Sequence, residues 1–218
     1  IGVIKEGWNG FNILHTAAGR VGALDVCALP GEGGKTTSEM LSSDLDVAIL
    51  AGADEIDVAK LGKAFVIYIG SHGDAGAARA DVILPGAAYT EKSSTYVNTE
   101  GRPQMTSRAA FPPGDAREDW AIIVNLAKRA GADLGFTSIG ALRAAMYQAA
   151  PQLAELNKLH KADAAALAAI GEAKGKPTKT AFTSPIKNFY LTNPIARASR
   201  IMAECSALKN GQQMQAAE

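Results

Sequence analysis

The chain has 218 residues, with twenty-two basic and twenty-two acidic side chains, and apolar residues make up 47% of it. This length and apolar content predict a globular fold of one or two domains rather than a disordered chain. The charge balance argues against nucleic acid as a partner, because proteins that bind it usually carry a basic excess. No apolar run approaches the roughly 20 residues of a membrane span, so direct membrane insertion is not expected.

The cysteine content limits the chemistry further. Cys27 and Cys205 are the only cysteines, and they lie far apart in the sequence. Disulfide frameworks and cysteine-ligated zinc or iron–sulfur sites need clustered cysteines. We therefore expect the two cysteine side chains to be small buried apolar groups in a protein of a reducing compartment. The chain begins with Ile1 rather than methionine and shows no signal peptide, which predicts a piece of a longer polypeptide.

The first forty residues predict two short helices joined by a glycine-rich stretch. Four apolar residues recur at helical spacing: Phe11, Leu14, Ala18 and Val21. Asn9 precedes them where a helix cap is expected. Thr36 and Glu39 then form a T-x-x-E capping box for a short helix that runs through Leu41.

The next part of the chain has the pattern of buried strands. Three short apolar runs rich in β-branched residues each end near glycine or proline: 47–50, 65–69 and 82–84. Continuous apolar runs are typical of strands covered on both faces, so they predict a short parallel, Rossmann-like sheet with right-handed crossovers. The intervening stretches 54–61 and 75–79 have room only for short helices or turns.

The rest of the chain is predicted to be extended at first and then helical. Residues 89–106 are polar and rich in threonine, which indicates extended structure with turns, and Pro112-Pro113-Gly114 marks a boundary. Four helices are predicted beyond it: after an Asp115–Glu118 capping box, from Ser138 to Pro151, over 162–173 up to the breaker Gly175-Lys176-Pro177, and from Asn193-Pro194 to Leu208 before a frayed tail. We therefore predict an α/β region over 1–111 and a helical C-terminal region over 112–218 that packs on it.

Two glycine-rich segments are candidates for phosphate sites. The run from Gly31 to Thr36 lacks the first glycine of a P-loop, since Leu29 stands in its place, and Thr36 is better explained as a helix cap. The loop from Gly70 to Gly76 follows a strand but reads G-x-x-G-x-x-G rather than the dinucleotide pattern. A turn in which His72 and Asp74 satisfy backbone groups is favoured, although α/β folds bind ligands at such strand ends.

The other polar residues give no catalytic pattern. His15, in a predicted helix, His72 and His160 show no metal-ligand spacing. Glu91-Lys92 and Glu100-Gly101-Arg102 could form local ion pairs, which at a surface contribute about 0–1 kcal/mol. We therefore predict no catalytic, cofactor-binding or metal-ligating residue in the chain.

Seven stretches nevertheless resemble a known family. They are 8–18, 72–77, 80–92, 95–102, 116–120, 186–193 and 197–199, with sequences such as Ala80-Asp81-Val82-Ile83-Leu84-Pro85 and Asn98-Thr99-Glu100-Gly101-Arg102. In this order they resemble the C-terminal region of the G subunit of NADH:quinone oxidoreductase, respiratory complex I. This G subunit is the large iron–sulfur subunit of the peripheral arm, and it has a molybdopterin oxidoreductase type of fold.

The resemblance implies a scaffold in the peripheral arm, with the rest of the large iron–sulfur subunit and neighbouring peripheral-arm subunits as partners. Iron–sulfur clusters on the route from NADH to quinone would then lie upstream of Ile1, and this stretch would hold no cofactor. The location implied is the cytoplasmic face of a bacterial inner membrane, or the matrix side in mitochondria. The isolated chain would neither oxidise NADH nor carry a cluster.

A second interpretation stays open, namely the C-terminal part of a true molybdopterin oxidoreductase. In it, the loop from Gly70 to Gly76 and the segment from Asn98 to Arg102 would hold the phosphates and pterin of the cofactor, since exposed amides and an arginine suit anions.

Overall fold

The computed structural model describes residues 4–5, 8–161, 163–171 and 178–211. They form two compact units, each assembled from three separate segments of the chain. One unit combines Ile1–Ala28, Thr95–Met105 and Arg143–Pro185, and the other combines Leu29–Ser94, Thr106–Leu142 and Ile186–Glu218. The units are called the hairpin unit and the sheet unit below. The predicted division between residues 111 and 112 stays a prediction.

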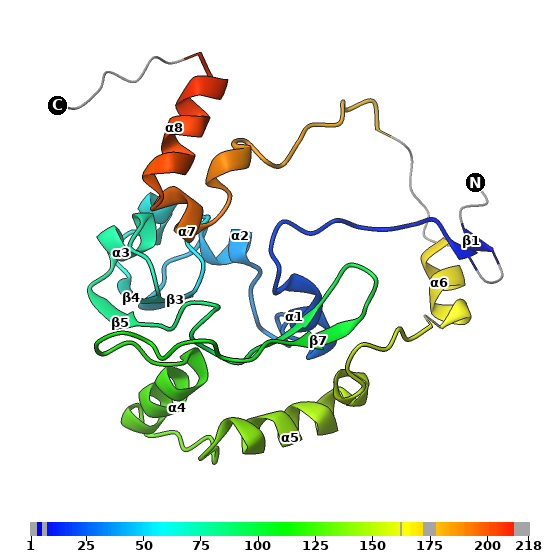
Figure 1. Cartoon of the computed structure of the whole chain (residues 1–218), viewed down its shortest axis with the longest axis horizontal. Helices are drawn as coiled ribbons and strands as arrows, with labels where there is room; N and C mark the ends of the chain where they lie inside the picture. The colour runs from blue at the N-terminus through cyan, green and yellow to red at the C-terminus, as the bar shows by residue number, and fades with distance from the viewer. Residues whose placement is uncertain (1–3, 6–7, 162, 172–177, 212–218) are drawn as a thin grey trace. The chain divides into compact units, whose positions relative to one another are not determined.

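The sheet unit contains the predicted parallel sheet. Its strands are β3 (Val47–Ala51), β4 (Phe65–Gly70) and β5 (Val82–Pro85), in the spatial order β3-β4-β5 (Figure 1). Both strand pairs are parallel, and the register places Val47 beside Phe65 and Ile67 beside Val82. The α/β prediction and all three strand positions are confirmed.

Short crossovers connect the strands. The 3₁₀ helix η1 (Val58–Leu61) leads from β3 to β4, and α3 (Ala75–Arg79) leads from β4 to β5. The core beneath them contains the buried residues Ala48, Leu61, Ala64 and Val66. The Arg79 guanidinium donates hydrogen bonds to the carbonyls of Gly62 and Ala64 just after η1, both at 2.9 Å.

The capping box before the sheet is confirmed. Helix α2 (Thr37–Met40) begins after Thr36, whose hydroxyl oxygen accepts from the Glu39 amide at 3.3 Å. The Glu39 carboxylate in turn accepts from the Thr36 amide at 2.7 Å. Thr36 therefore serves as a helix cap.

The helix after the proline-rich boundary begins later than predicted. Helix α4 spans Asp119–Arg129, and its cap residue Glu118 makes no side-chain capping bond, so the predicted Asp115–Glu118 box is wrong. The reason is that Arg117 is extended and forms a parallel bridge with Gly86. The Glu118 carboxylate instead accepts from the Trp120 indole at 3.1 Å and pairs with Arg108 at 3.3 Å.

The last predicted helix is interrupted. The cap at Asn193 is confirmed, because its side chain accepts from the Ala196 amide at 2.9 Å, but α7 ends at Arg197 (Pro194–Arg197). Ser199 is extended and caps a new helix, α8 (Arg200–Lys209). A single helix to Leu208 is therefore wrong. The short 3₁₀ helix η3 (Phe189–Leu191) precedes both.

The hairpin unit has two antiparallel strand pairs and several helices. Its elements are β1 (Ile4–Lys5), β2 (Trp8–Asn9), α1 (Arg20–Asp25), β6 (Thr95–Val97), β7 (Pro103–Met105), η2 (Pro151–Ala154) and α6 (Ala164–Gly171). Helix α5 (Ile139–Ala149) runs from the end of one sheet-unit segment into this unit. Val97, Ala150 and Leu153 form the buried core.

Several predictions for this unit are confirmed. Residues 89–106 form the predicted extended structure with turns, which includes the β6–β7 pair, and α5 follows Ser138 and ends before Pro151. The predicted helix over 162–173 is present as α6, whereas residues 162 and 172–177, with the predicted breaker, lie outside the described part, as does the tail from 212.

The helix predicted from Phe11 is wrong. Asn9 pairs with Ile4 in the first hairpin, and residues 10–15, including His15, have irregular backbone. Phe11 and Leu14 are 48% and 83% exposed, so the described residues offer their apolar side chains no core to pack against. Helical structure starts only at Arg20, in α1, whose Gly22 lies against Val97.

The end of α1 corrects the prediction for Cys27, which is exposed rather than buried. Its φ of 54° is left-handed, its amide donates to Leu24 at 2.9 Å, and the Ala28 amide donates to Ala23 at 2.8 Å. This pair of bonds is a Schellman motif, in which glycine is preferred at the left-handed residue. Cys205, in α8, is half-buried.

Replacing Cys27 with glycine is expected to raise the free energy of unfolding by about 0.5–1 kcal/mol. A left-handed conformation strains a side chain with a Cβ by about 1–2 kcal/mol, of which glycine's greater unfolded-state freedom cancels part. Chemical denaturation measures the change. Cys27→Ala is the control, because alanine keeps the Cβ and should give no such gain; equal gains from both variants would contradict the explanation.

None of the helices in the described ranges is both long and apolar enough to cross a membrane.

Candidate functional site

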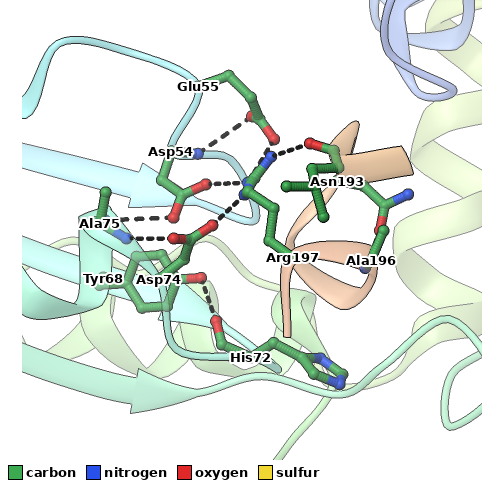
Figure 2. Close-up of polar contacts among 11 residues, drawn as sticks. Asp54, Glu55, Tyr68, His72, Asp74, Ala75, Asn193, Ala196 and Arg197 are labelled. Atoms are coloured by element: carbon green, nitrogen blue, oxygen red, sulfur yellow. Dashed lines mark hydrogen bonds and ion pairs between the residues drawn. The ribbon is translucent and has the colours of Figure 1, made fainter. Parts of the chain in front are cut away.

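Charged residues from three parts of the sheet unit meet at the carboxyl end of the parallel sheet. Asp54 and Glu55 lie in the loop after β3, Asp74 caps α3 after β4, and Arg197 is the last residue of α7. Because parallel strands end at the same edge, the two loops bring their carboxylates together there (Figure 2). We call these four residues the Arg197 cluster.

The guanidinium of Arg197 lies among all three carboxylates (Figure 2). Its Nη2 is 2.7 Å from Asp54 Oδ1 and 3.0 Å from Glu55 Oε1, and its Nε pairs with Asp74 Oδ2. The Asp54 side chain is only 1% exposed, whereas the Glu55 side chain is 49% exposed. The ion pairs with Asp54 and Asp74 therefore hold Arg197 more strongly than the pair with Glu55, since a half-exposed ion pair contributes little.

The remaining carboxylate oxygens bind the loop backbone. Asp74 Oδ1 accepts from the Ala75 amide at 2.8 Å, and Asp54 Oδ2 accepts from the Gly76 amide at 3.3 Å. The hydroxyl of Tyr68, a buried β4 residue, donates to the His72 carbonyl at 2.8 Å. The carboxylates of Asp54 and Asp74 and the hydroxyl of Tyr68 thus hold the loop from Gly70 to Gly76 in place.

The charges in this cluster shift pKa values in directions that follow from their neighbours. The hydrogen bond from Arg197 lowers the pKa of Asp74. Burial, assisted by the charges of Asp54 and Asp74, raises the pKa of Tyr68, which keeps its hydroxyl protonated as a donor. Burial alone would lower the pKa of Arg197, but hydrogen bonds with Asp74 and Glu55 raise it overall.

Acid is expected to weaken the cluster through Asp74. The folded-state pKa of Asp74 lies below the ordinary value of 3.8, so the folded state binds this proton less readily than the unfolded chain. The stabilisation is therefore complete above the unfolded-state pKa and is lost as the pH falls through the folded-state pKa.

Asp74→Asn isolates this charge, since asparagine also caps helices well. We expect the variant to be less stable than the native chain at about pH 7 and the difference to shrink towards about pH 2–3. Urea denaturation at both pH values measures it. A difference of the same size at both would show that the charge of Asp74 contributes nothing.

The structure brings together only some of the polar residues that the sequence offers as candidates. His72 and Asp74 lie in the loop that the Arg197 cluster fixes, and the turn in which Asp74 satisfies a backbone amide is confirmed. His72 Nδ1 is 2.9 Å from Ser71 Oγ. His160 lies 3.7 Å from Glu155 in the hairpin unit. Within the described residues, no three His, Cys, Asp or Glu side chains are arranged to hold a metal ion.

One of the two suggested ion pairs is present. Arg102 lies 3.5 Å from Glu100, and its guanidinium also donates to the Asn157 carbonyl at 2.6 Å. Lys92, however, pairs with Asp119 at the start of α4, while the Glu91 carboxylate accepts from the Ala88 amide at 2.9 Å. The Glu91–Lys92 interpretation is therefore wrong, because each side chain has a more distant partner along the chain.

Sequence reasoning missed Arg197 as a site residue. It lies 123 residues from Asp74 and 143 from Asp54 along the chain, so no local spacing links them. One signal was available: two neighbouring parallel strands are each followed by acidic residues, and such an edge needs a cation. The sequence does not show which of its basic residues supplies that cation.

Comparison with known proteins identifies the family. A family profile described as Molybdopterin oxidoreductase matches residues 1–129, more than half of the chain. The chain belongs to the molybdopterin oxidoreductase family. A second profile, which describes the C-terminal part of the G subunit of NADH-ubiquinone oxidoreductase, matches residues 150–205. The predicted family resemblance and molybdopterin oxidoreductase type of fold are confirmed.

Relatives within this family carry complex I names. The chain is 42% identical over 207 residues to "NADH dehydrogenase [ubiquinone] iron-sulfur protein 1, mitochondrial" of Solanum tuberosum, covering 94% of this chain and 27% of the relative. It is 44% identical over 205 residues to the "NADH-ubiquinone oxidoreductase 75 kDa subunit" of Reclinomonas americana, covering 92% and 29%. It is 39% identical over 207 residues to the G subunit of NADH-quinone oxidoreductase of Rickettsia bellii, covering 95% and 29%. The chain thus spans under a third of these curated relatives.

The family name implies a pterin cofactor with a phosphate-bearing side chain, but the strand-end residues do not fit one. The Ala75 and Gly76 amides already donate to carboxylates, which would repel a phosphate. A Cβ added at Gly76 would lie 2.8 Å from the Asp54 Cβ, so the loop is already tightly packed. Asn98 is likewise engaged by the Glu100 and Arg102 amides.

Proposed function

We propose that the chain is the redox-silent, C-terminal scaffold part of the large iron–sulfur subunit of complex I. It supports electron transfer from NADH to quinone without holding an electron itself. Iron–sulfur clusters lie in the part of the polypeptide beyond the stretch that matches the curated relatives. The names of those relatives and the C-terminal G-subunit profile over residues 150–205 support this assignment.

The Arg197 cluster is the observation that carries the redox-silent part of the proposal. An α/β protein of this kind binds its ligand at the carboxyl ends of parallel strands. Here Asp54, Asp74 and Arg197 occupy that position with one another and with the loop amides. A guanidinium paired with carboxylates has no accessible redox state, and its position at the strand ends supports a role in holding the fold together.

The partners follow from the same assignment. The chain packs on the rest of the large iron–sulfur subunit and on neighbouring peripheral-arm subunits, on the cytoplasmic face of a bacterial inner membrane or on the matrix side in mitochondria. Relatives named as subunits of this oxidoreductase support the partner class.

The second candidate is the C-terminal cofactor-binding part of a true molybdopterin oxidoreductase, which the profile match over residues 1–129 favours. Metal analysis, the visible spectrum, pterin fluorescence and NADH:ferricyanide activity of the purified chain separate the two. The scaffold proposal expects no stoichiometric metal and no NADH oxidation. Molybdenum with a pterin would support the second candidate, and stoichiometric iron would contradict the scaffold proposal directly.

A further inference from the structure

The amino-terminal half of one face of the parallel sheet is largely uncovered by the described residues of the sheet unit. The strand register places five apolar side chains on the amino-terminal part of that face, Val47, Ile49, Phe65, Ile67 and Val82, whereas Ile69, further along the same face, is buried. Val47 and Ile49 are each 53% exposed and Phe65 is 47% exposed. We call these five residues the open face. Parallel sheets are normally covered on both faces, so we expect another segment or molecule to pack on the open face.

The chain's own connections explain why this face stays open. The order β3-β4-β5 means that both crossovers step in the same direction across the sheet. Right-handed crossovers that step in one direction all lie on the same side, and η1 and α3 cover the side of Ala48, Val66 and Tyr68. Covering the other side needs a connection that steps away from β3 in the opposite direction, as in doubly wound sheets.

The outer edge of β3 agrees with this reasoning. Among the described residues β3 pairs with β4 alone, so its second edge offers unpaired backbone groups to a further strand. At the other end of the same face, Leu84 lines a groove together with Ile122 and Leu126 of α4. The uncovered part is therefore the amino-terminal half of the face, next to the free edge of β3.

We infer that the open face binds an amphipathic helix from the same polypeptide, in the part that lies beyond the stretch matched in the curated relatives. The matched stretch makes up only 27–29% of the length of those relatives, so each of them has a long further part of the polypeptide that could supply such a helix. The five side chains are aliphatic or aromatic and uncharged, so the occupant needs an aliphatic stripe and no buried charge. The inference rests on the proposed function only in taking the chain as part of a longer polypeptide.

Thiol labelling tests the inference. Ile49→Cys places a reporter on the open face, and Ile83→Cys places one on the opposite side of the sheet at a matching exposure, 53% against 54%. Both are made in a background with Cys27→Gly and Cys205→Ala. Maleimide labelling rates of the introduced thiol, followed on its own peptide by mass spectrometry because iron–sulfur ligands add other cysteines, are compared between the chain alone and a chimeric Rickettsia bellii relative in which this chain replaces the matched stretch.

We expect the Ile49→Cys thiol to react at least about tenfold more slowly in the longer polypeptide, because labelling must then wait for local opening. The Ile83→Cys rate should change much less. Val66→Cys, at a position with no exposure, checks folding by staying unreactive in both samples. The Reclinomonas americana relative serves as a second host if the first chimera fails that check.

Four results would overturn the inference. Equal Ile49→Cys rates in the two samples would mean that the longer polypeptide leaves the face open, and equal slowing at both positions would indicate general burial. Protection in the chain alone, with a dimer in sedimentation, would identify a second copy as the occupant. Protection only after other subunits are added would assign the face to one of them. Because labelling does not depend on bound metal or pterin, these results are independent of the test of the scaffold function.

Discussion

Replacing Arg197 with methionine is expected to lower the free energy of unfolding by about 3 kcal/mol at neutral pH. Removing one partner of a buried ion pair leaves an uncompensated charge, which typically costs about 3–5 kcal/mol. We expect the lower end, because the Arg197 side chain is 24% exposed and water screens part of the charge. Urea denaturation of both proteins measures the difference.

Arg200 provides a matched control, since it lies three residues further on, pairs with Glu204 at 3.0 Å and is 81% exposed. Arg200→Met is expected to cost only about 0.3–0.5 kcal/mol, as for other exposed helix pairs. Adding Asp54→Asn to Arg197→Met should restore part of the lost stability by removing the buried charge. Losses of equal size at Arg197 and Arg200 would show that the Arg197 cluster does not hold α7 on the sheet.

Replacing Tyr68 with alanine is expected to cost about 3–5 kcal/mol, the usual range for deleting a buried aromatic side chain. Tyr68 is 2% exposed, packs against Gly76 and holds the His72 carbonyl through its hydroxyl. Tyr68→Phe keeps the ring and is expected to cost only about 1 kcal/mol for the lost hydrogen bond. Denaturation of both variants separates packing from hydrogen bonding.

Tyr89→Ala is the control for this pair, because Tyr89 is 60% exposed and its deletion should change stability by at most about 0.5 kcal/mol. If Tyr68→Phe cost as much as Tyr68→Ala, the hydroxyl rather than the ring would carry the stabilisation. The assignment of Tyr68 as the packed base of the loop would then be wrong.

The parts of the fold that could be predicted from the sequence are those with short-range causes. Continuous apolar runs predicted β3, β4 and β5, and the Thr36–Glu39 spacing predicted a cap whose bonds lie within one helical turn. Pro151 and Asn193 likewise act on their immediate neighbours. In each case the residues that decide the structure are a few positions apart.

The predictions that failed depended on distant parts of the chain. The apolar spacing from Phe11 was helical, but the residues have no buried surface to pack against in the described structure. The Arg117 bridge to Gly86 delays α4, and Ser199 restarts a helix that apolar spacing alone would continue. Arg197 was missed for the same reason, because it lies 123 residues from Asp74 and 143 residues from Asp54 along the chain.

This separation also affects biosynthesis. A ribosome delivers β3, β4 and the three carboxylates more than a hundred residues before it delivers Arg197. Until then the acidic edge has no counter-charge from α7, so the nascent sheet is less stable than the finished one. Domains generally fold as units during translation, and this unit can reach its full stability only when its last segment has left the exit tunnel. A nonsense mutation that stops translation within the sheet unit before the codon for Arg197 would therefore leave an incomplete unit for cellular proteases to remove.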